Sequence, residues 1–134
     1  MRRSVPLAAL LMLTGVLPAA SAVDPTGFAF GRRGGNIRPY TVTIANTGVV
    51  HTSGAVIVGR THVTPVQLAT LNRIATETQF TMLPAATSCR DTLPDVASTY
   101  VRVGARTVRV HGGCVPRYQR LLTALKASVR LAAS

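Results

Sequence analysis

Acidic residues are scarce in this chain of 134 residues, which has four of them against 15 basic ones. The four are Asp24, Glu77, Asp91 and Asp95. No two of them are spaced like the paired carboxylates of an acid/base catalyst. The histidines (His51, His62 and His111) lack the spacing of metal ligands, and no serine lies in a nucleophile elbow. We therefore expect no enzyme activity, no metal site and no cofactor.

Long hydrophobic runs are also missing, apart from one near the amino terminus. There Arg2 and Arg3 precede an apolar stretch, residues 5–17, and a small-x-small pattern ends at Ala22. The stretch is too short and wrongly flanked for a membrane span, and it is typical of a cleavable secretory signal. We expect cleavage after Ala22, a signal peptide over residues 1–22 and one domain over residues 23–134. The location would be secreted, periplasmic or cell-envelope.

Cysteine is equally rare, and both copies, Cys89 and Cys114, lie after the predicted cleavage site. A lone pair in an oxidising compartment favours a disulfide. A metal pair or a reactive thiol would need a Cys-x-x-Cys spacing or a catalytic signature, and the sequence has neither. We expect a disulfide between Cys89 and Cys114.

Positive charge is what the sequence has in excess. Without the signal peptide it has 13 basic residues, 12 of them arginine, for a net charge near +9. One interpretation is a genome that favours arginine and alanine; the other is an acidic partner such as a wall polymer or an anionic membrane surface. The scattered placement of the arginines favours the first. Nucleic acid is not expected as a partner. With only 3 Tyr and 3 Phe, the chain has few aromatic side chains on which bases could stack, and the predicted export makes such a partner less accessible.

The most regular pattern in the chain predicts a β-hairpin over residues 100–111. Valines alternate with polar residues on both sides of Gly104-Ala105. A two-residue turn there places Val101 opposite Val108 and puts all four valines on one face. The other face then carries Tyr100, Arg102, Thr107, Arg109 and His111.

Three further strands are predicted before the first helix, over residues 28–32, 40–45 and 49–53. Gly48 suits a three-residue hairpin loop that places Val50 beside Ile44. The apolar run at residues 55–58 either extends the third strand past a bulge or forms an edge strand.

Two helices complete the pattern. Thr64 and Gln67 form a capping box around Pro65, and Pro116 starts a second helix that runs towards Ala132. Between them, residues 84–97 are expected to form a long loop tethered by Cys89. The order β-β-β-α-β-β-α predicts an α+β fold, a two-layer antiparallel sheet with helices on one face, and we expect a monomer.

The order of these motifs resembles a known family. The quoted motifs are the Gly34-Gly35 loop, the hairpin over residues 40–50, the Val63-Thr64-Pro65 helix start, Phe80-x-x-Leu83-Pro84 and Pro116-x-x-x-x-Leu121-Leu122. Over residues 28–125 the order is similar to the small bacterial domain typified by emfourin, an inhibitor of thermolysin-like metallopeptidases, and to a related domain of unknown function. The resemblance implies an extracellular peptidase as partner. The export signal, the cysteine pair and the strong positive charge depart from it, and it transfers no inhibitory residue to this chain.

These observations predict a secreted binding module, in its most specific version an emfourin-like protease inhibitor. The alternative is a basic cell-envelope protein that binds acidic polymers or lipid headgroups. The candidate binding residues are Tyr100, Arg102, Arg109 and His111, joined by Arg32 and Arg33 if the first strand pairs nearby. The competing interpretation is a solvated face whose arginines only keep the protein soluble.

Overall fold

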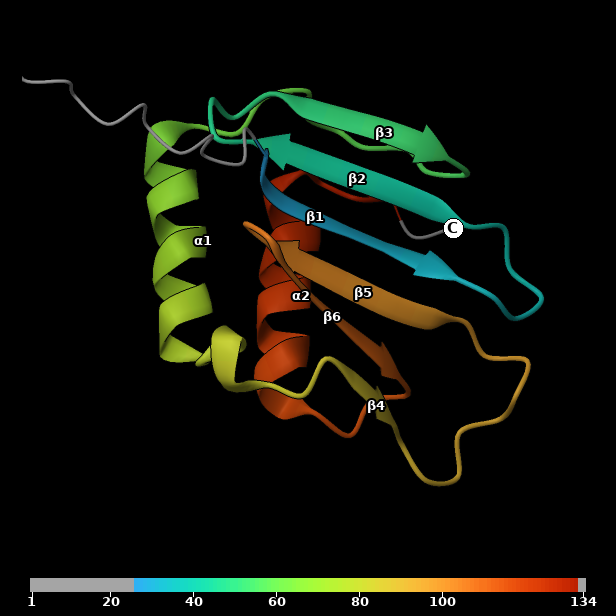
Figure 1. Ribbon diagram of the computed structural model, residues 1–134. Coiled ribbons are helices and arrows are strands. Elements are labelled where there is room, and N and C mark those ends of the chain that lie inside the picture. Colours follow the sequence, from blue (N-terminus) through green and yellow to red (C-terminus); the bar gives the residue numbers. More distant parts are fainter. Residues whose placement is uncertain (1–25, 133–134) are drawn as a thin grey trace, which may run out of the picture.

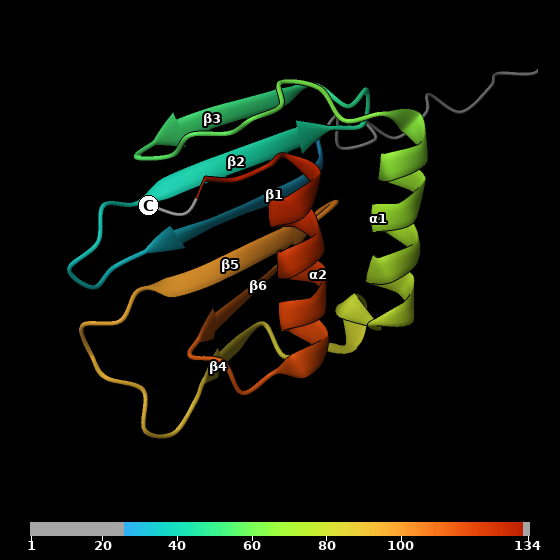
Figure 2. The ribbon, with the colours of Figure 1, turned by 180° about the vertical axis from the view of Figure 1, so that it is seen from behind.

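The computed structural model describes residues 26–132, so the predicted signal peptide and Asp24 lie outside it (Figure 1). Its elements are β1 (Thr26–Arg33), β2 (Tyr40–Ala45), β3 (Val50–Gly54), α1 (Pro65–Glu77), the short 3-10 helix η1 (Phe80–Met82), β4 (Ala86–Ser88), β5 (Ser98–Val103), β6 (Arg106–His111) and α2 (Pro116–Ser128). The strands form one sheet in the order β3-β2-β1-β5-β6-β4. Both helices lie against the same face of this sheet (Figure 1, Figure 2).

The predicted α+β two-layer fold is confirmed, but the sheet is mixed and not wholly antiparallel. β4 runs parallel to β6, with Ala86 opposite Arg109. The prediction of a loop throughout residues 84–97 is therefore wrong at β4. This strand forms because β6 offers unpaired backbone groups at its edge: Arg109 donates its N–H to Ala85 O at 2.9 Å, and Cys89 donates to His111 O at 2.8 Å.

The register of the last hairpin is confirmed, with Val101 opposite Val108 across the turn at Gly104-Ala105. Alternation along both strands sends the valines to the helix side, where Val101, Val108 and Val110 are buried. They pack with Phe28 and Phe30 from β1. The other large side chains of this core include Tyr40, Val42, Ile44, Leu71, Phe80, Leu83, Tyr118, Leu121, Leu122 and Leu125.

The first hairpin also forms as predicted, with Ile44 opposite Val50 and Gly48 at a φ of 91°. Neither alternative for residues 55–58 is correct. The run forms no strand; only Val58 makes an isolated bridge, and its partner is Leu131 beyond α2. An apolar run suits a strand locally, but here it packs against the end of α2.

Both helices begin where the sequence predicts. The capping box is complete, since Thr64 Oγ1 accepts from Gln67 N at 3.2 Å and Gln67 Oε1 accepts from Thr64 N at 2.9 Å. The second helix ends at Ser128 and does not run on towards Ala132. Arg130 takes a φ of 50°, and the chain turns away so that Ala132 N donates to Ile57 O at 3.0 Å.

The predicted disulfide is present between Cys89, at the end of β4, and Cys114, just before α2, with Cα atoms 5.7 Å apart. Gly112 allows this close approach: a Cβ there would lie 2.6 Å from Cys89 Cβ. The bond is consistent with an oxidising compartment. Of the helices in residues 26–132, none is long and apolar enough to cross a membrane.

Candidate binding site on the open sheet face

The face of the sheet opposite the helices, here called the open face, carries two aligned rows of side chains. The cross-strand pairs place Thr41, Gly31, Tyr100 and Arg109 in one row. They place Thr43, Ala29, Arg102 and Thr107 in the next. Small residues on β1 thus lie between the threonines of β2 and the side chains of β5 and β6. The short side chains in the middle leave a depression in the surface of the open face.

A hollow of about 520 Å³ lies over this low centre, and we call it the central hollow. Its lining is Ala29, Arg33, Thr41, Thr43, Ala85, Ala86, Tyr100, Arg102, Thr107 and Arg109. Three arginines therefore surround a floor of alanines and threonine hydroxyls.

Tyr100 lies on the predicted face, but it is not displayed to solvent: only 8% of it is exposed. Its ring lies across Gly31, where a Cβ would come within 2.7 Å of the phenol oxygen. The phenol hydrogen-bonds to Thr41 Oγ1 on β2. Arg33 covers the ring, with its guanidinium carbon 4.9 Å from the ring centre. Tyr100 is therefore part of the floor of the site.

Strand alternation separates the two arginines that the sequence grouped together. Arg33 lies on the open face over Tyr100, whereas Arg32 faces the helix side, 5.0 Å from the centre of the Tyr40 ring. Arg32 Nε also donates to Arg38 O at 3.2 Å. Burial raises the pKa of Tyr40, while the Arg32 charge acts in the opposite direction. Of the pair, only Arg33 contributes to the open face.

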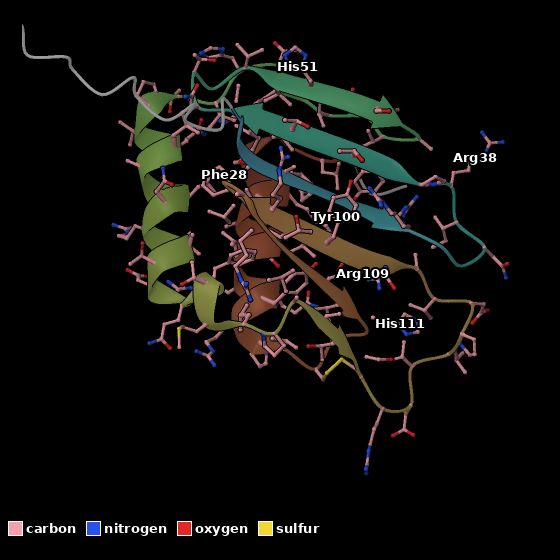
Figure 3. The ribbon with its side chains drawn as sticks, in the orientation of Figure 1. Phe28, Arg38, His51, Tyr100, Arg109 and His111 are labelled. Carbon is pink, nitrogen blue, oxygen red and sulfur yellow. A yellow bond between two sulfur atoms is a disulfide. The ribbon has the colours of Figure 1, made fainter. Side chains whose placement is uncertain are left out.

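A second hollow, of about 570 Å³, adjoins the loops after β1 and β4, and we call it the loop-side hollow. Its lining is Arg33, Gly34, Gly35, Ala86, Thr87, Ser88, Pro94, Val96, Ser98, Arg109 and His111. His111 Nε2 donates to Val96 O at 2.9 Å, which holds the ring at the rim. Arg109 and His111 follow one another along β6 on the near face of the sheet in Figure 3.

No carboxylate lines either hollow in the part of the chain that the structure describes. Glu77 lies in the helix layer, 2.6 Å from Arg120 and 3.7 Å from Arg73. Asp91 and Asp95 lie in the loop between β4 and β5. Positive charge on the open face is thus not matched by acidic residues of the same hollows.

The structure brings together four of the predicted residues, Arg33, Arg102, Arg109 and His111, around two adjoining hollows, with Tyr100 beneath and Arg32 elsewhere. Sequence reasoning placed Thr107 on this face but missed the other threonines and the serines of the lining. The alternation of Thr41 and Thr43 with Tyr40, Val42 and Ile44 marked them as one face of a strand. What could not be read was the pairing of β1 with β5, which joins the two hairpins. Residues 26–132 contain no cluster of three His, Cys, Asp or Glu side chains fit for a metal ion.

Comparison with protein-family models, with curated proteins and with solved structures found no match to this chain.

Proposed function

We propose that this protein is a non-catalytic binding module of the cell envelope whose open face binds an acidic envelope component. The observation that carries the proposal is the gathering of Arg33, Arg109 and His111 around two hollows without a lining carboxylate. The resemblance to peptidase inhibitors names a partner but no residue, whereas the open face presents a definite chemistry. That chemistry is complementary to anions.

Attraction at such a site depends on salt. Exposed charges are screened over about 10 Å at 0.1 M salt, so binding to an acidic polymer should weaken steeply as salt rises. A contact built on a packed apolar centre should persist under the same conditions. Salt therefore distinguishes this function from a peptidase-inhibitor contact.

The test uses a charge-reversed variant and a matched control. Arg33→Glu/Arg109→Glu changes the open face, whereas Arg60→Glu/Arg117→Glu makes the same change of net charge at one half-buried and one exposed position outside both hollows. We expect the wild type and the control to sediment with purified cell envelopes at low salt, and the first variant to stay in solution. Equal sedimentation of both variants would overturn the proposal.

A second candidate function, the emfourin-like inhibitor, is favoured by the loop between β4 and β5. Leu93 in this loop is 65% exposed. The loop is held by the disulfide at Cys89, by Val96 N donating to Leu93 O at 3.1 Å, and by Asn36 N donating to Asp95 O at 3.2 Å. A held loop that presents an apolar side chain loses little conformational freedom when a partner binds it.

Titrating a thermolysin-type peptidase with the protein and with Leu93→Asp tests this second candidate. Inhibition by the wild type that the variant loses would support it. If the wild type leaves the peptidase fully active at micromolar concentration, the candidate fails for that class of enzyme.

A further inference from the structure

The central hollow and the loop-side hollow adjoin one another. Arg33, Ala86 and Arg109 line both of them. We call the combined depression the trough. It extends over the open face from the threonines of β2 to the serines beside the β4–β5 loop. A ligand that fills the trough must be an extended chain, because a single small anion would occupy only one of two hollows of about 520 and 570 Å³.

The cations are spread along the trough and do not converge at one point. β1 and β6 are separated by β5, so the backbones at Arg33 and Arg109 lie roughly 10 Å apart across the sheet. His111 follows Arg109 on the same side of β6, about 7 Å further along the strand. Such spacing suits a ligand with negative charges repeated along its length.

The remaining lining is rich in hydroxyl groups. Thr41, Thr43 and Thr107 line the central hollow, and Thr87, Ser88 and Ser98 line the loop-side hollow. Hydroxyls both donate and accept hydrogen bonds, so they pair with the hydroxyls of sugars as well as with anions. Guanidinium groups bind planar carboxylates through two parallel hydrogen bonds. The two chemistries occur together in a sugar chain that carries carboxylates.

The trough offers no platform for nucleic-acid bases. Tyr100 is the one Phe, Tyr or Trp among its lining residues, and Arg33 already covers its ring. Binding of single-stranded nucleic acid usually depends on bases stacked on exposed aromatic faces. A polyanion that needs no stacking fits this surface better.

We propose that the trough binds an acidic polysaccharide, a chain of sugar rings with repeated carboxylates, with the arginines on the carboxylates and the threonines and serines on the sugar hydroxyls. The proposal rests on the proposed function and makes it specific. It commits to a carboxylated sugar chain and not to a lipid surface or an inorganic polyanion.

The experiment measures calorimetric binding of oligogalacturonates from one to eight residues, with their methyl esters as uncharged controls. We expect affinity to rise by about tenfold or more between the dimer and the hexamer as both hollows become occupied, and no binding of the esters. Arg33→Glu/Arg109→Glu should abolish binding, and Arg60→Glu/Arg117→Glu should retain it. Equal binding of acid and ester would overturn the proposal.

Two further binding measurements distinguish failure of the polysaccharide proposal from failure of the proposed function. Polyphosphate and phosphatidylglycerol vesicles supply repeated anions without sugar hydroxyls. If either binds through Arg33 and Arg109 while oligogalacturonates do not, the polysaccharide is wrong and acidic binding stands. If none of the three probes binds, both proposals fail.

A hydroxyl-deleted variant tests the sugar contacts directly. Thr43→Val/Thr107→Val keeps the shape and strand preference of both positions. We expect it to weaken oligogalacturonate binding several-fold and to leave any binding of polyphosphate unchanged. An unaltered affinity for oligogalacturonate would contradict the assigned role of the hydroxyls.

Discussion

At the scale of single residues, the open face depends on Gly31. It is the position where the backbone of β1 lets the Tyr100 ring lie flat, and the ring in turn supports Arg33. A polar, cationic surface is thus built on a buried aromatic residue. The binding chemistry of Arg33 and the packing of Tyr100 are therefore coupled.

We predict that Gly31→Ala destabilises the protein by about 2–3 kcal/mol or more, because its Cβ would lie 2.1 Å from Tyr40 O and 2.7 Å from the Tyr100 phenol oxygen. Gly113→Ala is the control: nothing lies within 4 Å of the added carbon, so its effect should stay within about 0.5 kcal/mol. Urea denaturation measures both. Equal stability of the two variants would show that both the Tyr100 ring and the backbone at Tyr40 can move aside without cost.

Tyr118 gives a prediction about alkaline pH. Burial raises its pKa to about 12, and the hydrogen bond from Thr99, 2.8 Å between oxygens, only partly opposes this. The unfolded chain loses this proton near pH 10, so the stabilising effect is complete below pH 10 and is lost as pH rises from about 10 to about 12. The free energy of unfolding should fall by roughly 1.4 kcal/mol per pH unit in that window.

Comparing the wild type with Tyr118→Phe between pH 8 and 11.5 isolates this contribution. The variant should lose about 1 kcal/mol at neutral pH, because Thr99 loses its partner, and should show a shallower alkaline decline. Parallel curves for the two proteins would contradict the assignment.

At the scale of elements, the sequence predicted those with a regular local signal. The valine hairpin, the Ile44–Val50 pairing and the capping box at Thr64 each carry their own pattern, and each formed as predicted. β4 has three residues and no alternation, and it exists because the edge of β6 accepts it. The pairing of β1 with β5 likewise joins segments that are far apart in the sequence. Because the hollows depend on that pairing, they could not be predicted from the sequence.

The disulfide links the end of β4 to the start of α2, and the loss of stability on its removal should be measurable. Closing a loop with a sequence separation of 25 stabilises by about 3 kcal/mol in the chain-entropy model. Cys89→Ser/Cys114→Ser should therefore lower the thermal midpoint by roughly 10 °C while the protein still folds, because Cys89 is only one of many buried residues in the core. Reduction of the wild type should reproduce the shift, and reduction of the variant should have no effect. An unchanged midpoint would show that the unfolded chain is already restricted.

At the scale of the whole molecule, the helix layer and the open face of the sheet differ in how their arginines are placed relative to acidic residues. The acid of the helix layer, Glu77, is paired with Arg73 and Arg120, while the cations of the open face adjoin hollows without a lining carboxylate. An anion bound there should stabilise the fold as a whole. At a ligand concentration 100 times the Kd we expect about 2.7 kcal/mol, seen as a higher thermal midpoint at low salt and lost at 0.5 M NaCl. If the ligand raised the thermal midpoint equally at low and high salt, its binding would depend on apolar contacts and not on charge.

The place of β1 in the sheet also governs the order in which an emerging chain can fold. β2 and β3 come directly after β1 in the chain, and β2 can pair with β1 early. The other edge of β1 stays unpaired until β5 (Ser98–Val103) has been made. The apolar side of Phe28 and Phe30 waits longer still, for α2 (Pro116–Ser128). Until the last helix is released, the amino-terminal strands expose an unpaired edge and an uncovered apolar face, which are targets for chaperones and for aggregation. A chain arranged in this way cannot complete its sheet or cover its core until almost all of it has been made.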